Sequence, residues 1–209
     1  MKFLDCPELS VITSSLDDTI FGDHRVRGQA EAYSCKLAGE DKHLLKEISH
    51  SDAKENLSTS FVPAVVPTPS AGARLMVNLI GAMNASFPEN DFSTVESDNF
   101  TLTSIETAAR FANQNLATLY PSNPGVINDM WAAMDHVIQL KDCKVLVFNP
   151  ENPDLHPYAD ALWKFVFLFY NPKLNRLLLF GCSSWSSTSP RKLDEDDDIS
   201  ISDGDEDPY

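Results

Sequence analysis

Two strongly apolar segments joined by a short turn constrain the architecture of this 209-residue chain more than any other feature. Residues 162–170 and 174–182 are rich in leucine and phenylalanine, and Asn171-Pro172-Lys173 lies between them. Pro172 presets the backbone angle that the second position of a type I turn requires. The two segments are therefore predicted to form a hairpin. Because both strands look apolar on both faces, we expect helices or other parts of the chain to cover each side.

Two further strands and four helices are predicted around this hairpin. Residues 24–36 alternate loosely between apolar and polar side chains, and residues 144–149 are strand formers. The helices are indicated by apolar residues three and four positions apart, which form one stripe per helix. These stripes comprise Leu9, Ile12 and Leu16; Met76, Leu79, Ile80, Met83 and Phe87; Ile105, Ala108, Ala109, Ala112, Leu116 and Leu119; and Ile127, Met130, Trp131, Met134 and Val137. The predicted fold class is α+β, a single domain with a mainly antiparallel central sheet of about four to five strands flanked by helices.

Local signals mark where two of the helices begin. Asp5 and Glu8 are spaced for a capping box around the first turn, in which Pro7 fits. Asn123 is expected to cap the last helix, with Pro124 in its first position.

The chain is predicted to be one globular domain, residues 1–185, with two irregular regions. Residues 49–72 lose periodicity and are rich in Ser, Thr, Asn, Pro and Gly, which indicates a mobile loop. Residues 186–209 are predicted to be a disordered acidic tail, because they contain too little apolar surface to offset the entropy of ordering. Nine acidic residues and no basic residue lie between positions 194 and 209.

The net charge of −15 limits the class of partner. Affinity for nucleic acid comes chiefly from Lys and Arg side chains that replace counterions along the phosphate backbone, so we expect no direct nucleic-acid binding. An acidic surface is attracted to basic clefts on other proteins, and a field of opposite sign speeds their encounter. A protein partner is therefore expected.

The cysteines and apolar runs exclude other classes. Cys6, Cys35, Cys143 and Cys182 are scattered without the spacing of a zinc site, so we expect four buried reduced thiols and no metal or cofactor. The acidic residues among positions 1–9 interrupt any signal peptide, and the longest strongly apolar run is far too short to span a bilayer. A soluble intracellular protein without a membrane partner is predicted.

A catalytic role is the less favoured alternative. Cys35 is a conceivable nucleophile of a hydrolase, with His24, His43 or His136 as its base. The sequence nevertheless lacks the nucleophile elbow, the zinc-protease motif and the glycine-rich phosphate loop. We therefore predict that the chain is not an enzyme and has no catalytic residues.

Three stretches resemble the signature boxes of a known family. Residues 26–42, with the core Glu31-x-Tyr33-Ser34-Cys35-Lys36, closely resemble the first box of the Maf-type global repressors of RNA polymerase III. Residues 87–93 are similar to the second box, and residues 162–182 to the third. The boxes occur in the order found in the family, and from the first to the last they span residues 26–182, nearly the whole predicted domain.

This resemblance implies a repressor that binds RNA polymerase III at its clamp and its mobile winged-helix subunit. Such a protein blocks recruitment of the initiation factor TFIIIB and lowers transcription of tRNA genes. The resemblance also implies control by nutrients and stress through TOR signalling, in which kinases inactivate the protein during growth and phosphatases reactivate it in starvation. We expect a monomer that shuttles between cytoplasm and nucleus.

Charged residues of the boxes are the expected contacts with the polymerase. The candidates are Lys36, Asp41, Lys42 and Asp91, with Arg176 as a further candidate. Structural roles remain open for them, because Asp91 is also suited to cap a helix and the stem of Lys36 to cover apolar surface.

Candidate phosphorylation sites lie in the two irregular regions. Thr68 and Ser189 each precede a proline, and Ser200 and Ser202 are flanked by acidic residues. Family members commonly carry a basic patch before the helix that follows the loop, whereas only Arg74 stands there in this chain, so control by basophilic kinases is doubtful. The alternative function is an acidic scaffold that recruits other regulators through its tail.

Overall fold

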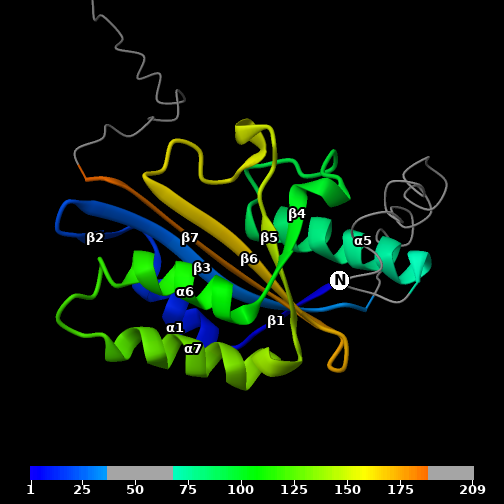
Figure 1. The fold of residues 1–209 in the computed structure, drawn as a ribbon, viewed down its shortest axis with the longest axis horizontal. Coiled ribbons are helices and arrows are strands. Elements are labelled where there is room, and N and C mark those ends of the chain that lie inside the picture. The colour runs from blue at the N-terminus through cyan, green and yellow to red at the C-terminus, as the bar shows by residue number, and fades with distance from the viewer. Residues whose placement is uncertain (37–67, 188–209) are drawn as a thin grey trace, which may run out of the picture.

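A computed structural model describes residues 1–36 and 68–187, and Figure 1 shows the one sheet that runs through them. Its seven strands are β1 (Lys2–Leu4), β2 (Thr19–Phe21), β3 (His24–Ser34), β4 (Phe100–Thr103), β5 (Lys144–Phe148), β6 (Trp163–Asn171) and β7 (Arg176–Ser186). Their order is β1-β3-β7-β6-β5-β4, β2 also pairs with β3, and every pairing is antiparallel. The predicted antiparallel sheet is confirmed, but the expected four to five strands were too few. Strands β1, β2 and β4 are too short to show a period of two.

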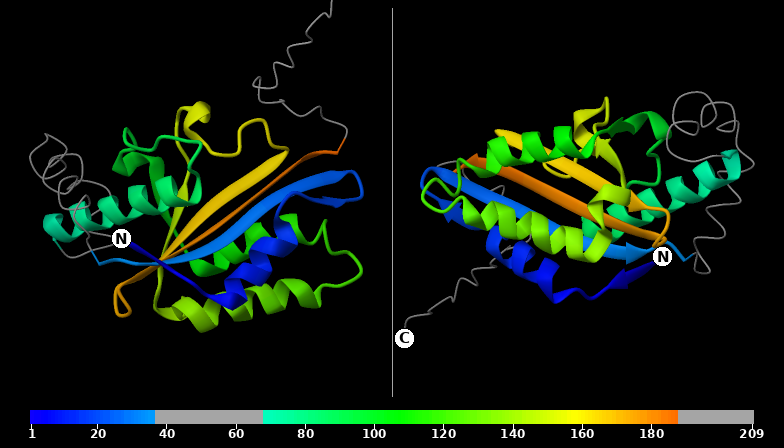
Figure 2. Two further views of the ribbon diagram at one scale, coloured as in Figure 1. Left: turned by 180° about the vertical axis from the view of Figure 1, so that it is seen from behind. Right: turned by 60° about the horizontal axis from the view of Figure 1, so that its bottom comes forward.

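In the described ranges four helices cover the two faces of the sheet, and Figures 1 and 2 show how they are arranged. They are α1 (Pro7–Leu16), α5 (Pro69–Ser86), α6 (Ile105–Leu116) and α7 (Gly125–Ile138). Three short 3₁₀ turns span Ser97–Asn99, Leu140–Asp142 and Pro153–Leu155. Helices α1, α6 and α7 contribute to the core on one face, and α5 contributes to the core on the other.

The hairpin of β6 and β7 lies in the centre, as predicted. Leu178 and Phe180 of β7 face the α1/α6/α7 core, whereas Leu177 and Leu179 face the α5 core. All four are fully buried. Because side chains alternate along a strand, a strand that is apolar throughout requires a cover on each side, and the helices supply it.

The outer edge of β3 is completed by the segment from β1 to β2. Strand β1 pairs with the C-terminal end of β3 and β2 with its N-terminal end. Between them the hydroxyl of Thr13, on α1, accepts a hydrogen bond from the Ala30 amide at 3.0 Å and lies 3.3 Å from the Ala30 carbonyl oxygen. A side chain of α1 thus satisfies an edge that would otherwise be exposed. Gly28 permits this packing, because a Cβ there would lie 3.0 Å from Leu16 and from the sulfur of Cys182.

Two predicted helix starts were wrong in detail. Helix α1 does begin at Pro7, but its N-cap residue is Cys6 and no side chain caps it, so the capping box of Asp5 and Glu8 is not formed. Helix α7 begins at Gly125 after Pro124, and no side-chain cap is present. The proline residues therefore locate these helix starts better than the polar residues beside them.

The boundaries of both irregular regions also need correction. Helix α5 begins at Pro69, so the predicted loop 49–72 was wrong for its last four residues; residues 49–67 lie outside the described part of the chain. Strand β7 continues to Ser186, and the Ser187 amide donates to the Asp23 carbonyl at 2.9 Å. The first two residues assigned to the tail therefore belong to the domain, and residues 188–209 lie outside the description.

Within the described ranges, no helix is long and apolar enough to cross a membrane.

Candidate functional site

Lys36, which follows the end of β3, borders an open pocket of about 520 Å³. Arg74 and Asn78 of α5 lie four residues apart, which places them one turn apart on the same side of the helix. The Asn78 side-chain amide donates to the Arg74 carbonyl at 2.8 Å. Asn78 is buried, and its Oδ1 has no hydrogen-bond donor among the described residues. The pocket therefore combines two cations with an unused buried acceptor.

Other lining residues connect this pocket to the central hairpin. Tyr170 of β6 forms part of its wall, and burial raises the pKa of the Tyr170 hydroxyl. Asn175, in the turn between β6 and β7, accepts a hydrogen bond on its carbonyl from the Cys35 amide at 2.9 Å. This bond holds the residue before Lys36 against the rigid hairpin, so the position from which the Lys36 side chain extends is well defined.

Lys36 and Arg74 are both exposed. Neither side chain forms a hydrogen bond or an ion pair with another residue of the ranges 1–36 and 68–187. A guanidinium binds carboxylates and phosphates through a planar fork of N–H groups, and an ammonium binds them as a point charge. The arrangement is suited to an acidic group of a partner.

Glu31 and Tyr33, the first residues of the Glu-x-Tyr-Ser-Cys-Lys core, have a structural role. The Tyr33 hydroxyl donates to the Glu31 carboxylate, to which Ser86 at the end of α5 also donates at 2.6 Å. Gln29 donates to the Ser86 carbonyl at 2.8 Å. Burial, with a smaller contribution from the hydrogen bond to Glu31, raises the pKa of Tyr33. This network fastens β3 to the C-terminal end of α5.

Asp91 lies five residues beyond the C-terminal end of α5. Its Oδ1 accepts a hydrogen bond from the Ser93 amide at 2.8 Å, and hydrogen bonds from Ser93 lower the pKa of the exposed Asp91 carboxyl. The residue stabilises a turn, and the alternative that it caps a helix is not what the structure shows. Arg74 lies twelve residues, about 18 Å of α-helix, before the end of α5, and Asp91 is not among the residues that line the pocket. Asp91 and the Lys36 pocket do not form one site.

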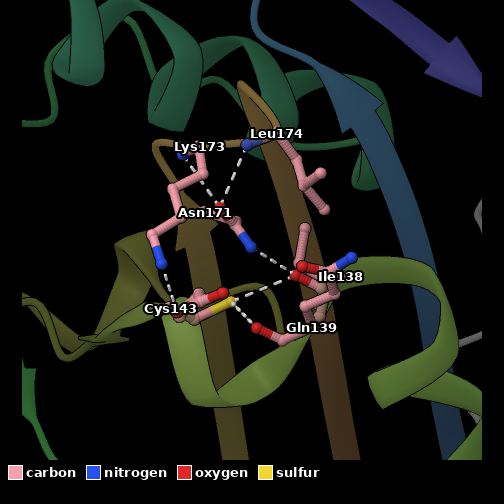
Figure 3. A network of polar contacts seen from close by, with 7 residues as sticks. Ile138, Gln139, Cys143, Asn171, Lys173 and Leu174 are labelled. Atoms are coloured by element: carbon pink, nitrogen blue, oxygen red, sulfur yellow. Dashed lines mark hydrogen bonds and ion pairs between the residues drawn. The ribbon is translucent and has the colours of Figure 1, made fainter.

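A polar network joins the hairpin turn to the end of α7 (Figure 3). The amide nitrogen of the fully buried Asn171 donates to the Ile138 carbonyl at 2.7 Å, and its Oδ1 accepts from the amides of Lys173 and Leu174. The Cys143 thiol lies 3.6 Å from the same Ile138 carbonyl oxygen. A helix leaves its last four carbonyls without helical partners, and these side chains supply partners here.

Arg176 contributes to the same helix end. Its Nη1 donates to the Val137 carbonyl at 3.0 Å, and the side chain is partly buried. Since this guanidinium already binds the end of α7, its contacts give it a structural role. A contact between Arg176 and a partner stays a prediction.

Thr68 is the described member of the predicted phosphorylation sites. It is the N-cap residue of α5, and its hydroxyl accepts a hydrogen bond from the Ala71 amide at 3.3 Å. The remaining predicted residues lie outside the described ranges: Asp41, Lys42, Ser189, Ser200 and Ser202.

The geometry disfavours Cys35 as a nucleophile. The residue is buried, and burial raises the pKa of its thiol to about 12, so little thiolate exists near neutral pH. The His24 ring is hydrogen-bonded to Ser184 at 3.0 Å, and the His136 ring lies 3.2 Å from a Glu8 oxygen, so each contacts a residue other than Cys35. His43 lies outside the description.

The four cysteines differ in burial. Cys35 and Cys182 are buried, but Cys6 and Cys143 are partly exposed, so the prediction of four buried thiols was wrong for two. All four are free. The described residues contain no group of three or more His, Cys, Asp or Glu side chains arranged to hold a metal ion.

Comparison with known proteins identifies the family. The family model described as "Maf1 regulator" matches residues 26–181, which is most of the chain and includes all but the last residue of the three boxes. This chain belongs to the Maf1 regulator family.

Relatives in the Maf1 family are named for repression. The chain is 28% identical to "Repressor of RNA polymerase III transcription maf1" of Schizosaccharomyces pombe, over 95% of this chain and 90% of the relative. It is 26% identical to "Repressor of RNA polymerase III transcription" of Dictyostelium discoideum, over 87% and 84%. The Saccharomyces cerevisiae MAF1 repressor is 30% identical over 69% of this chain but only 36% of its own length.

Solved Maf1 structures agree with the fold. One crystal form of citrus MAF1 superposes with a TM-score of 0.69 and 27% identity, covering 87% of this chain and 99% of that one. A second crystal form gives a TM-score of 0.67 at 25% identity. The α+β single-domain prediction is confirmed.

The Maf1 boxes did not reveal the whole pocket. Arg74 and Asn78 lie between the first and second boxes, and the sequence marked Arg74 only as the remnant of a basic patch. Their spacing of four on a helix was the one available signal, but it does not show that this side of α5 meets the end of β3.

Proposed function

We propose that this chain represses transcription by RNA polymerase III. It binds the polymerase at the clamp and the winged-helix subunit and blocks TFIIIB-dependent initiation. The observation that carries the proposal is the family match over residues 26–181, together with two relatives, matched over most of their own length, that are named repressors of RNA polymerase III transcription. The mode of action is occlusion by the folded domain.

In this proposal the pocket beside Lys36 is a docking surface. Lys36 and Arg74 receive acidic side chains of the polymerase, and Asp41 and Lys42 extend the contact along the first box. Asp91 binds a basic residue at the far end of α5. Lys36, Arg74 and Asp91 are exposed, which supports the proposal. Neither Lys36 nor Arg74 forms an ion pair with another residue of the ranges 1–36 and 68–187.

Control by phosphorylation is part of the same proposal. Thr68 caps α5 and its hydroxyl bonds Ala71, which lines the pocket. A phosphate there is favoured by the helix N-terminus and places negative charge near Lys36 and Arg74, where it competes with an acidic partner. Ser189, Ser200 and Ser202 are further sites for growth-controlled kinases, and their dephosphorylation accompanies entry of the monomer into the nucleus.

The decisive experiment is a defined transcription reaction. Purified protein is added to RNA polymerase III, its initiation factors and a tRNA gene, with a polymerase II reaction as the control. We expect selective loss of the tRNA transcript. Equal inhibition of both polymerases, or of neither, would contradict the proposal.

Charge reversal tests the docking surface. Lys36→Glu combined with Arg74→Glu is expected to weaken polymerase binding by about tenfold or more, because it places like charges against the partner's acidic groups. Binding is measured by titration of immobilised polymerase. The matched control is Lys144→Glu combined with Arg110→Glu, which changes the charge equally at exposed positions on β5 and α6. If the two double variants lose the same affinity, the pocket is not the docking surface.

A further inference from the structure

Arg27 and Lys164 flank one residue of the central strand on the α5 face of the sheet. Arg27 of β3 and Lys164 of β6 both pair directly with Ser183 of β7. Directly paired residues project to the same face, and with strands about 4.8 Å apart their Cα atoms are about 10 Å apart. Gln29, two residues further along β3, bonds the end of α5, so this pair lies just beyond that helix. Arg27 is exposed and Lys164 is partly exposed.

No described residue pairs with either cation. Arg25, the preceding residue on this face of β3, binds Asp18 through two hydrogen bonds, one of them 2.8 Å long. By contrast, no side-chain hydrogen bond or ion pair joins Arg27 or Lys164 to any other residue of the described ranges.

Apolar groups border this cationic pair. The Trp185 ring lies 6.2 Å from that of Tyr158, and its indole N–H donates to the Ala159 carbonyl at 3.1 Å. Leu162, just before β6, is 64% exposed. Asp160, directly after Ala159 in the loop before β6, places one carboxylate in this region of the chain. We call Arg27, Lys164, Leu162 and Trp185 the basic patch.

The acidic end of the chain begins close to this patch. Strand β7 carries both Ser183 and Trp185 and ends at Ser186, after which Ser187 is held by Asp23. Ser187 lies four residues, about 13 Å of strand, from Ser183. The seven residues from position 187 to Asp194 reach at most about 25 Å. The acidic segment is therefore long enough to turn back onto the patch.

We propose that the segment 194–209 binds in cis to the basic patch. Its carboxylates pair with Arg27 and Lys164, and its isoleucines, Ile199 and Ile201, contact the apolar members. Exposed ion pairs are individually weak, but a short tether gives the segment a high effective concentration. The contact is therefore reversible and sensitive to salt. It makes the patch unavailable to any other acidic ligand until the segment is released, and it does not depend on the proposed polymerase binding.

Nuclear magnetic resonance of the full chain tests this contact. Backbone amide shifts of residues 194–209 are compared with those of a synthetic peptide of residues 188–209. At about 50 mM salt the shifts in the full chain are expected to differ from the peptide's, and at about 500 mM salt they should converge on them. Arg27→Glu combined with Lys164→Glu should abolish the difference at low salt, whereas the matched Arg110→Glu, Lys144→Glu control should retain it.

Three results would overturn the proposal. The first is identity of the full-chain and peptide shifts at low salt, and the second is an equal effect of the control variant. The third is a shift difference that disappears on dilution, which would place the segment on a second copy of the chain.

Chemical cross-linking of the protein without substitutions tests the same contact and does not depend on the folding of a variant. Carbodiimide should cross-link the Lys164 amine to carboxylates of 194–209 and spare the exposed Lys144. Equal cross-linking of both lysines would contradict the patch.

Discussion

His156 is a single residue whose chemistry depends on its surroundings. It is buried, its Nδ1 accepts a hydrogen bond from the Tyr158 amide at 3.2 Å, and its ring lies 6.0 Å from that of Phe148. Burial, with a smaller contribution from the charge of Lys164, lowers the pKa of His156 from 6.5 to about 4. The folded protein therefore requires a neutral imidazole at this position.

Because of His156, the free energy of unfolding is predicted to decrease as the pH is lowered. Between about pH 6.5 and pH 4 the unfolded chain binds a proton at His156 that the folded protein does not, so acid favours unfolding. From pH 7 to pH 5 the contribution of His156 to this loss is on the order of 2 kcal/mol. Urea unfolding at the two pH values measures it. His156→Phe should remove this part of the pH dependence, and His136→Gln, at a side chain 76% exposed, should keep it. An unchanged pH dependence in His156→Phe would contradict the assignment.

At the scale of elements, the hairpin completes helix α7 as well as the sheet. Asn171 and Arg176 begin and end the turn region between β6 and β7 and bind the carbonyls of Ile138 and Val137. The third box therefore contains polar residues for a structural reason. Gln139, which ends α7 in a left-handed conformation with φ of 56°, leaves these carbonyls to be bound by side chains.

Asn171→Ala is expected to lower the free energy of unfolding by about 2 to 4 kcal/mol, because it leaves one helix carbonyl and two turn amides without partners in a buried place. Denaturant unfolding measures the loss. The matched control is Asn123→Ala, at an exposed asparagine that caps no helix, and it should change stability by less than about 0.5 kcal/mol. Similar losses in both variants would show that the network contributes little.

At the scale of the whole molecule, both cores share the strands between them. Phe180 packs on the α1/α6/α7 side and its neighbour Leu179 on the α5 side of the same strand. Any displacement of β7 therefore affects both cores. One cooperative unfolding transition is expected for the described domain.

Phe180→Ala should lower the free energy of unfolding by about 3 to 5 kcal/mol, because it leaves a cavity in the α1/α6/α7 core. Amide exchange in α5, on the opposite face, should become faster as well. Leu102→Ala, at a side chain 39% exposed, is the control and should change exchange little. If the amides of α7 exchange faster in Phe180→Ala while those of α5 keep their protection, the two cores are not coupled as expected.

The amino-acid sequence by itself determined the features that depend on neighbouring residues. The apolar hairpin and its central place were predictable because a strand without a polar face needs two covers, and four helices were visible from their stripes. The signature boxes were sufficient for the family, since they are local strings of residues.

Only the tertiary structure decided which distant residues meet. Strands of three residues, such as β1 and β2, carry no periodic signal and form because β3 offers them an edge. Arg74 and Asn78 become part of a pocket with Lys36 only when α5 packs beside the hairpin, and Arg27 meets Lys164 only through the pairing of three strands. Such sites depend on contacts between positions far apart in the chain, and one sequence records the residues without their pairing.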